Sequence, residues 1–296
     1  MITILFMGSK EAEEGYENEL KKIITNLDFR VYPQIGDNRD IEYILVKKPT
    51  IADFTVFSNL KAIISLTVGL DQFIDLKISS KTPVFRMLDE GHKISMSEFI
   101  LHSVFYYHRR IFNYDLQQQN KIWEEHPLIP SRNRKVGFMG FGEMAKMPAY
   151  ILRDLGFNLS CWSKTFKNIS GITSFYGKEE LNVFLHDLDI LVCLLPLTKE
   201  TENILNFSTM SILPKGASII NVGRGRCLNE NDLVCLLNEN HLIGATLDVF
   251  QKEPLDKESP LWKHPKIKIT PHIASKADYL KAAEFIKTKI GKNTVT

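Results

Sequence analysis

Cysteine is scarce in this sequence, and its positions favour reduced thiols over a disulfide framework. Among 296 residues there are four cysteines, and none of them forms a CxxC pair. Isolated thiols in apolar surroundings behave as small hydrophobic side chains. We therefore expect reduced thiols, a cytoplasmic protein and no metal site. The four are Cys161, Cys193, Cys227 and Cys235.

Long apolar runs and a strong charge bias are also missing. No stretch of about 20 apolar residues could span a membrane, and Met1–Met7 is expected to be a short strand rather than a signal peptide. The formal net charge is +2, which gives no signal for binding nucleic acid or a membrane surface. The short basic runs at 47–48 and 263–268 are interpreted as solvated faces.

The composition is that of an ordinary globular protein, with 44% hydrophobic and 24% charged residues. The length favours two domains, and apolar strand-like stretches alternate with helical ones, which predicts an α/β fold. We expect two Rossmann-like or flavodoxin-like parallel-sheet domains with a cleft between them, at 1–98 and 99–271, and a C-terminal segment, 272–296, that returns to the first domain. Strands are expected at 2–7, 29–32, 43–46, 62–66 and 84–86, then at 136–140, 158–162, 188–195, 217–222, 242–249 and 267–270.

Residues 97–120 are expected to form one long helix. The stretch is rich in Phe, Tyr, Leu and Ile on more than one side. A helix of this kind is buried on several faces. It is therefore a candidate both for a hinge element and for a dimer surface.

A glycine pattern follows the first strand of the second domain. Gly140-x-Gly142-x-x-Ala145 stands between an apolar strand and a helical stretch, and a second strand follows. In this context Gly140 permits a tight turn, Gly142 lets a diphosphate approach the backbone, and the small Ala145 lets helix and strand pack closely. The pattern predicts a dinucleotide site, with Met144 among its contacts, rather than an ordinary strand–helix turn.

The residues after the second strand indicate which dinucleotide binds. An NAD site usually carries Asp or Glu there, to hold the ribose 2′-hydroxyl. This sequence has Ser163, Lys164 and Thr165 instead. A hydroxyl and an ammonium group suit a 2′-phosphate, which favours NADP(H) over NAD(H). The alternative is a basic, solvated loop.

Two residues depart from a smooth match to a dinucleotide unit. Pro148 falls where the helix should be running, and a proline in a helix interior costs about 3 kcal/mol. We therefore expect a local kink or an irregular first turn. Glu143 lies near the expected diphosphate, which its charge would repel unless the side chain points to solvent.

Three residues that follow strands of the second domain could carry chemistry. They are Arg224, Glu253 and His272, and ligands of open α/β sheets bind beyond the carboxyl ends of the strands. Arg224 could hold a substrate carboxylate and polarise the adjacent carbonyl. His272 could protonate that carbonyl as hydride arrives, and Glu253 could orient the imidazole. Each residue alone has a purely structural alternative, but together they predict reduction of a 2-oxo acid.

A candidate carboxylate cradle lies in the first domain. Residues 67–71 follow a strand and include Gly69, so consecutive backbone N–H groups could face an anion. The alternative is an ordinary strand-to-helix turn that Asp71 caps. This stretch alone favours the ordinary turn.

These motifs resemble those of the D-isomer-specific 2-hydroxyacid dehydrogenases, and most closely the glyoxylate/hydroxypyruvate reductase A type. The likeness covers nearly the whole chain and is most specific in 140–145, 161–165, 194–201, 213–217, 221–225, 247–254, 259–264 and 270–274. It implies that 1–98 binds substrate and 99–271 binds the dinucleotide, and that the protein is a homodimer. It also implies that Arg224, Glu253 and His272 are catalytic and that Ser163 and Lys164 serve an NADP site. The resemblance further implies that Asp248 binds the nicotinamide carboxamide and that the amides of Val68 and Gly69 bind the substrate carboxylate. The other implied cofactor contacts are Leu195, Pro196, Val222 and Gly223.

The sequence departs from the family pattern on the substrate side. Lys47-Lys48 replace a Trp-His type of pair, Thr67-Val68 replace Gly-Ala, and His92-Lys93 replace Met-Gly. The reductase class is therefore better supported than the substrate, and the lysine pair raises the hypothesis of an oxo acid with a second negative charge. Two alternatives stay open: a dinucleotide-sensing regulatory protein without turnover, and a dehydrogenase for another small anion.

Overall fold

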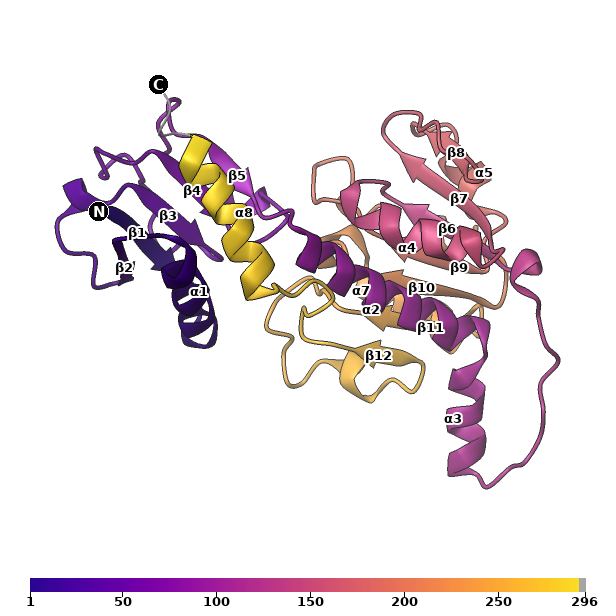
Figure 1. Ribbon diagram of the computed structural model, residues 1–296. Helices are drawn as coiled ribbons and strands as arrows, with labels where there is room; N and C mark the ends of the chain where they lie inside the picture. Colours follow the sequence, from indigo (N-terminus) through magenta and orange to yellow (C-terminus); the bar gives the residue numbers. More distant parts are fainter. Residues whose placement is uncertain (293–296) are drawn as a thin grey trace. The chain divides into compact units, whose positions relative to one another are not determined.

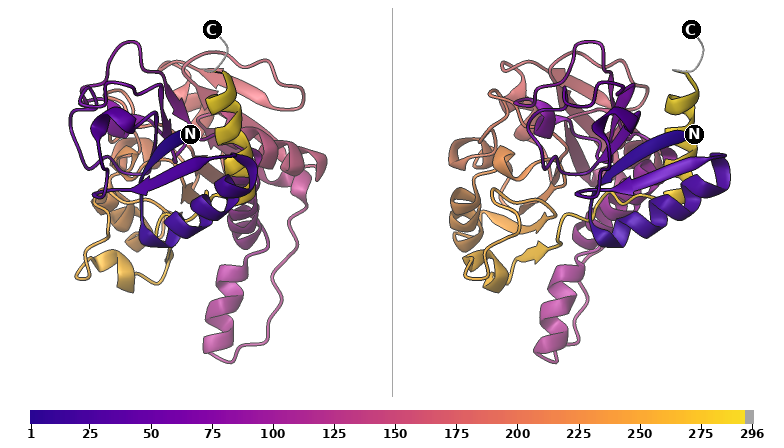
Figure 2. Two further views of the ribbon diagram at one scale, coloured as in Figure 1. Left: turned by 60° about the vertical axis from the view of Figure 1, so that its left-hand side comes forward. Right: turned by 90° about the vertical axis from the view of Figure 1, so that its left-hand side faces the viewer.

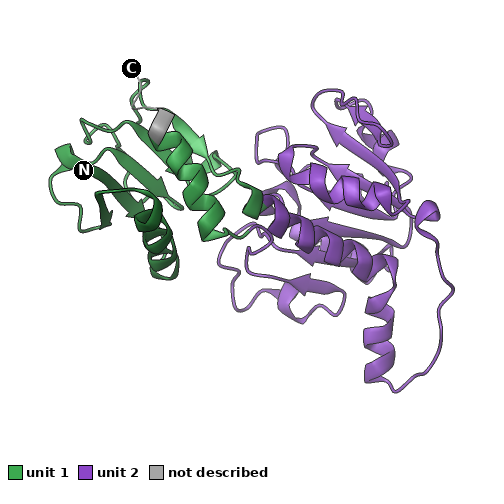
Figure 3. Cartoon of the chain, in the orientation of Figure 1, with its two compact units in different colours: residues 1–92, 276–296 green, residues 93–275 purple. Residues whose placement is uncertain are grey.

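A computed structural model describes residues 1–292 of the chain, which divides into two compact units (Figures 1 and 3). Of the described residues, 1–92 and 276–292 form unit 1, and 93–275 form unit 2. The chain therefore passes from one unit to the other at 92/93 and 275/276. The boundaries expected from the sequence are 98/99 and 271/272. Both units are built on parallel sheets with flanking helices, which is the α/β class that the alternating pattern predicts.

Unit 1 is built on a five-stranded parallel sheet in the order β2-β1-β3-β4-β5. The order 2-1-3-4-5 is the flavodoxin-like arrangement. The central strands are buried along almost their whole length, as expected when both faces of a parallel sheet are covered. The strands are β1 (Ile2–Met7), β2 (Leu27–Val31), β3 (Tyr43–Val46), β4 (Ala62–Ser65) and β5 (Val84–Arg86).

Helices cover one face of this sheet and loops cover the other. Helices α1 (Lys10–Ile23) and α8 (Tyr279–Lys292) lie side by side, and Leu20, Ala283 and Ile286 are fully buried against the sheet. On the opposite face Phe54 and Phe57 come from the loop between β3 and β4. Short 3-10 turns occur at Asn38–Asp40 (η1), between β2 and β3, and at Asp71–Phe73 (η2), between β4 and β5.

Unit 2 is built on a seven-stranded parallel sheet in the order β12-β11-β10-β9-β6-β7-β8. From β6 the chain first adds strands on one side and then crosses to β9 on the other, so the direction of winding reverses between β6 and β9. In open α/β sheets such a switch point is where ligands bind. The strands are β6 (Lys135–Met139), β7 (Asn158–Ser163), β8 (Thr173–Tyr176), β9 (Ile190–Cys193), β10 (Ala217–Asn221), β11 (Leu242–Leu247) and β12 (Ile267–Ile269).

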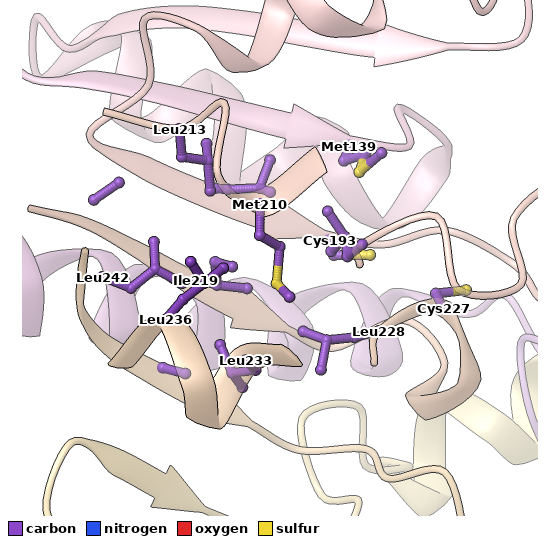
Figure 4. Packing of buried hydrophobic residues seen from close by; sticks show 14 of the residues in the cluster. Met139, Cys193, Met210, Leu213, Ile219, Cys227, Leu228, Leu233, Leu236 and Leu242 are labelled. Atoms are coloured by element: carbon purple, nitrogen blue, oxygen red, sulfur yellow. The ribbon is translucent and has the colours of Figure 1, made fainter. Parts of the chain in front are cut away.

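Both faces of this sheet are covered by helices. One face carries α5 (Leu181–Leu185), α6 (Phe207–Met210) and α7 (Glu230–Asn238), whose side chains form a continuous apolar cluster with the strands (Figure 4). The other carries α2 (Glu90–His108) and α4 (Glu143–Asp154). There the hydroxyl groups of Tyr107 and Thr246 lie 3.0 Å apart. Short 3-10 turns occur at Ser131–Asn133 (η3), Gly225–Cys227 (η4) and Pro260–Lys263 (η5).

The expectation of a single helix at 97–120 is wrong. The chain forms α2 and then α3 (Ile111–Gln119), and Arg110 between them adopts the left-handed conformation with φ of 55°. This conformation costs roughly 1–2 kcal/mol for a residue with a Cβ. A 2.7 Å hydrogen bond from the Tyr106 hydroxyl to Asp115 and ring contacts between Phe112 and Tyr107 offset that cost. Figure 2 shows α3 extending away from the sheet of unit 2.

Strand β8 was not predicted from the sequence. This strand lies at the edge of the sheet, and none of its four residues is buried. A short, half-exposed edge strand lacks the apolar run from which the other strands were predicted.

Candidate functional site

The fingerprint turn connects β6 to α4 at the switch point of the unit 2 sheet. Gly140 has φ of 95°, and a Cβ there would lie 3.0 Å from the carbonyl carbon of Leu194. Its N–H donates to the Trp162 carbonyl at 2.8 Å. Gly142 is the N-cap of α4, and a Cβ at this position would meet no atom within 4 Å. The first glycine is therefore required by the turn, and the second leaves the backbone open to a ligand.

Helix α4 accommodates the proline that the sequence analysis singled out. The helix runs from Glu143 to Asp154 with Pro148 inside it. Ala145 is fully buried, and Pro148 and Ala149 are also buried. The small and cyclic side chains thus form the face that packs on the sheet, and Met144 belongs to the same buried face. Helical structure continues through Pro148 to Asp154, where α4 ends.

The end of β7 carries the residues expected to distinguish the two dinucleotides. Ser163 is the last residue of the strand, and its hydroxyl donates to the Thr165 carbonyl at 2.7 Å, while Lys164 is exposed. The charge of Lys164 acts on an acid in the loop after β9. The pKa of Glu200 is lowered mainly by a hydrogen bond from Thr198, and to a smaller extent by the charges of Lys164 and Lys178.

Arg224 sits on a tight turn after β10. The buried Asn221 clamps this turn, because its Oδ1 accepts from Gly223 N–H at 3.2 Å and its Nδ2 donates to the Arg224 carbonyl at 3.3 Å. A Cβ on Gly223 would lie 2.7 Å from the Leu195 carbonyl oxygen, and one on Gly225 would lie 1.9 Å from the carbonyl carbon of Phe250. The two glycines thus press the arginine turn against the loops that follow β9 and β11.

Glu253 follows β11 and receives two hydrogen bonds. Its Oε1 accepts from the Phe250 N–H at 3.1 Å, and its Oε2 lies 2.7 Å from Nδ1 of His272. Burial would raise the pKa of this carboxyl. The hydrogen bonds from His272 and Phe250 and the charges of His272 and Arg224 outweigh burial, so the pKa of Glu253 lies below its usual range. The carboxylate is therefore ionised at neutral pH.

His272 is held in place by Asp248. The His272 backbone has φ of 53°, and its N–H donates to the Asp248 carbonyl at 2.9 Å. The Asp248 carboxylate, 1% exposed, accepts from the Thr270 hydroxyl at 2.6 Å and from the N–H groups of Ile273 and Ala274 at 2.7 and 2.8 Å. Asp248 therefore fixes the loop after β12 on both sides of the imidazole.

The three candidate catalytic residues thus lie on loops that follow β10, β11 and β12, three neighbouring strands at one edge of the sheet. His272 and Glu253 are in direct contact, and the charge of Arg224 acts on Glu253. With Nδ1 directed at Glu253, Nε2 is the nitrogen left to exchange a proton with a ligand. Leu195, Pro196 and Val222 follow β9 and β10 between this group and the fingerprint turn.

The predicted carboxylate loop belongs to unit 1. Val68 and Gly69 follow β4, and the loop is ordered by hydrogen bonds from the Thr67 hydroxyl to the Gly69 carbonyl at 3.0 Å and from Gln72 Nε2 to Ser65 and Thr67 at 3.1 Å. Lys47 and Lys48 are exposed just after the neighbouring strand β3.

Some kinds of site find no support in the part of the chain that the structure describes. Among residues 1–292 no group of three or more His, Cys, Asp and Glu side chains could hold a metal ion. Within the same range no helix is both long enough and apolar enough to cross a membrane. The four cysteines are free thiols, and burial raises the pKa of Cys193 to about 12.

Comparisons with known proteins agree with this geometry. Residues 101–274 match the family model for the NAD-binding domain of the D-isomer-specific 2-hydroxyacid dehydrogenases. A glyoxylate/hydroxypyruvate reductase A from Yersinia enterocolitica is 39% identical over 248 residues, covering 81% of this chain and 79% of the relative. The one from Citrobacter koseri is 37% identical over 279 residues, covering 92% of this chain and 89% of the relative.

Solved structures show the same relationship. A D-isomer-specific 2-hydroxyacid dehydrogenase from Xanthobacter autotrophicus Py2, in complex with NADPH and MES, has a TM-score of 0.93 and 33% identity, with 99% of this chain and 94% of that one covered. An NADPH-dependent glyoxylate/hydroxypyruvate reductase from Sinorhizobium meliloti, in complex with NADP and sulfate, has a TM-score of 0.91 and 27% identity, with 99% and 95% covered. The chain belongs to the D-isomer-specific 2-hydroxyacid dehydrogenase family.

Proposed function

We propose that this protein is an NADPH-dependent reductase that converts a small 2-oxo acid, such as glyoxylate or hydroxypyruvate, to the D-2-hydroxy acid. The observation that carries the proposal is the 2.7 Å contact between His272 and Glu253, beside Arg224, at the edge of a dinucleotide-type sheet. The names of the relatives support the substrate class, and the NADPH and NADP in related structures support the cofactor.

The fingerprint turn fits a dinucleotide, because the space beside Gly142 is open and the N–H groups that begin α4 can bind phosphate oxygens. We assign Gly140, Gly142, Met144 and Ala145 to this end of the cofactor. Ser163 and Lys164 are assigned to the ribose end, where they favour a 2′-phosphate. When bound, the reduced nicotinamide would supply a hydride.

The loops between these residues and the catalytic group would line the rest of the cofactor. Four residues of these loops are assigned to it: Leu195, Pro196, Val222 and Gly223. A Cβ on Gly223 would lie 2.7 Å from the Leu195 carbonyl oxygen, so no larger side chain fits at that position. Asp248 is the candidate for the nicotinamide carboxamide. In that role Asp248 would bind the carboxamide in addition to holding the loop of His272. That loop already donates hydrogen bonds to both carboxylate oxygens of Asp248.

The protein's own residues divide the remaining work. Arg224 would hold the substrate carboxylate with its planar guanidinium group and polarise the neighbouring carbonyl. The amides of Val68 and Gly69, in the loop after β4, are assigned to binding of a substrate carboxylate. His272 would donate a proton from Nε2 to the carbonyl oxygen, and Glu253 would stabilise the imidazolium through Nδ1 before that transfer. The neutral imidazole would then regain a proton from solvent.

A panel of 2-oxo acids tested with NADPH and with NADH would examine this proposal. Loss of the reduced-nicotinamide absorbance gives kcat and KM for each pair. We expect turnover of glyoxylate and hydroxypyruvate and a higher kcat/KM with NADPH. If NADPH binds but no 2-oxo acid is reduced, the dinucleotide-sensing alternative is favoured. Turnover confined to another class of small anion would favour the third possibility.

We further propose that the protein is a homodimer and that α3 and the segment after it contribute to the contact. This region carries exposed apolar side chains: Ile111 is 41%, Leu116 47% and Trp123 101% exposed. Light scattering after gel filtration would test the proposal. The unaltered chain should have twice the monomer mass, and the variant Leu116→Asp/Trp123→Asp should dissociate. A monomeric unaltered chain would contradict it.

A further inference from the structure

Three charged side chains meet at the first turn of α4, beside the fingerprint glycines. The Oε1 of Glu143 accepts a hydrogen bond from the Lys146 ammonium group, which is one turn along the same helix. The other carboxylate oxygen, Oε2, lies 3.7 Å from Nζ of Lys93 on α2. All three side chains are partly exposed, at 29% for Lys93, 39% for Glu143 and 44% for Lys146. Two cations and one carboxylate leave this cluster with one net positive charge.

The carboxylate of this cluster is kept ionised by its neighbours. The hydrogen bond from Lys146 is the largest influence and lowers the pKa of Glu143. Burial acts in the opposite direction, and the charges of Lys146 and Lys93 add to the lowering. A negative side chain in the first turn stabilises the helix. The same charge opposes binding of an anion at this place, unless the lysines compensate for it.

We infer that Lys93 and Lys146 are binding residues for the diphosphate of the dinucleotide, and that Glu143 is the counter-ion that holds them beside Gly142 and moderates the affinity. The inference rests on the proposed function, because it needs a dinucleotide at the fingerprint turn. Glu143 alone would repel a diphosphate, but two ammonium groups, one from each of two helices, more than balance that repulsion.

The diphosphate is common to NADH and NADPH, which gives the inference a distinctive signature. Loss of Lys93 or Lys146 must weaken both dinucleotides by the same factor. Loss of Lys164, at the end of β7, must weaken NADPH far more than NADH, because only NADPH carries the 2′-phosphate. Loss of Glu143 must act in the opposite direction to loss of either lysine.

The experiment measures dissociation constants of NADPH and NADH by nicotinamide fluorescence, without substrate. The variants are Lys93→Met, Lys146→Met, Glu143→Gln and Lys164→Met. The matched control is Lys215→Met, because Lys215 is an exposed lysine just before the amino end of β10, whereas the fingerprint turn follows the carboxyl end of β6. Thermal unfolding of each variant without dinucleotide reports whether the fold is intact. Each titration is run at about 0.1 M and about 1 M salt, where the screening length falls from about 10 to about 3 Å.

We expect Lys93→Met and Lys146→Met each to raise both dissociation constants about two- to fivefold at low salt, the size typical of a partly exposed charge pair. Glu143→Gln should lower both about twofold or more, and these differences should shrink at high salt. Unchanged constants in both lysine variants, or weaker binding by Glu143→Gln, would overturn the inference and leave the proposed function standing. Failure of the unaltered protein to bind NADPH would overturn both.

Discussion

Nδ1 of His272 lies 2.7 Å from Oε2 of Glu253, and this contact joins the loop after β12 to the loop after β11. The contact fixes one ring nitrogen and directs the other away from the carboxylate.

Replacing His272 should separate chemistry from binding. For His272→Gln we expect kcat to fall by about 10²–10⁴-fold, the usual contribution of a general acid. The dissociation constant for NADPH should change little, because no fingerprint residue is altered. His186→Gln is a suitable control, because His186 is exposed and lies before the amino end of β9, whereas His272 lies after the carboxyl end of β12. Unchanged turnover in His272→Gln would remove the imidazole from the mechanism.

The pH profile should reveal the role of Glu253. Its lowered pKa keeps the carboxylate ionised through the neutral range. Activity should be lost only when the pH falls far enough to protonate Glu253, because the neutral carboxyl is a weaker acceptor for Nδ1 of His272. In Glu253→Gln this acid limb of kcat/KM should disappear, and kcat should be lower at every pH. Glu258→Gln, an exposed change in the same segment, should leave the limb in place.

Removal of Asp248 should loosen the loop that carries His272. Asp248→Ala would leave the N–H groups of Ile273 and Ala274 without their acceptor, at about 1–3 kcal/mol for each buried group. We expect the free energy of unfolding to fall by about 2–4 kcal/mol, and hydrogen exchange at these two amides to accelerate. Asp154→Ala at the exposed end of α4 should change stability by less than about 0.5 kcal/mol. Equal exchange rates in Asp248→Ala and the unaltered protein would contradict this role.

Two glycines should respond differently to the same added methyl group. In Gly142→Ala the new Cβ meets no atom within 4 Å, so thermal unfolding should be unchanged while the dissociation constant for NADPH rises. In Gly225→Ala the new Cβ would lie 1.9 Å from the carbonyl carbon of Phe250, so the arginine turn must move. We expect lower stability and loss of most activity. Tight NADPH binding by Gly142→Ala would argue against a phosphate at that position.

Much of the fold follows from local pattern, because the buried parallel strands are continuous apolar runs. β1, β3, β4 and β10 were predictable to within a residue or two for this reason. The edge strand β8 has no such run. The break at Arg110 depends on the contacts of Tyr106 with Asp115 and of Phe112 with Tyr107, which only the folded chain brings together.

The candidate site was predictable for the same kind of reason, since its residues follow strands that end at one edge. Arg224, Glu253 and His272 could be chosen by type and position, and the contact between the last two agrees with the orienting role expected from the residues alone. The three hydrogen bonds that Asp248 receives from the loop after β12 could not be anticipated. Neither could the approach of Lys93 to Glu143, because the two residues are 50 positions apart on different helices.

The account is tested most directly by incubating the purified protein with NADPH and hydroxypyruvate and counting products. We predict one D-2-hydroxy acid for each NADPH consumed, identified by chiral chromatography alongside the loss of nicotinamide absorbance. NADPH that binds and is never consumed, or a product of the L configuration, would contradict the account.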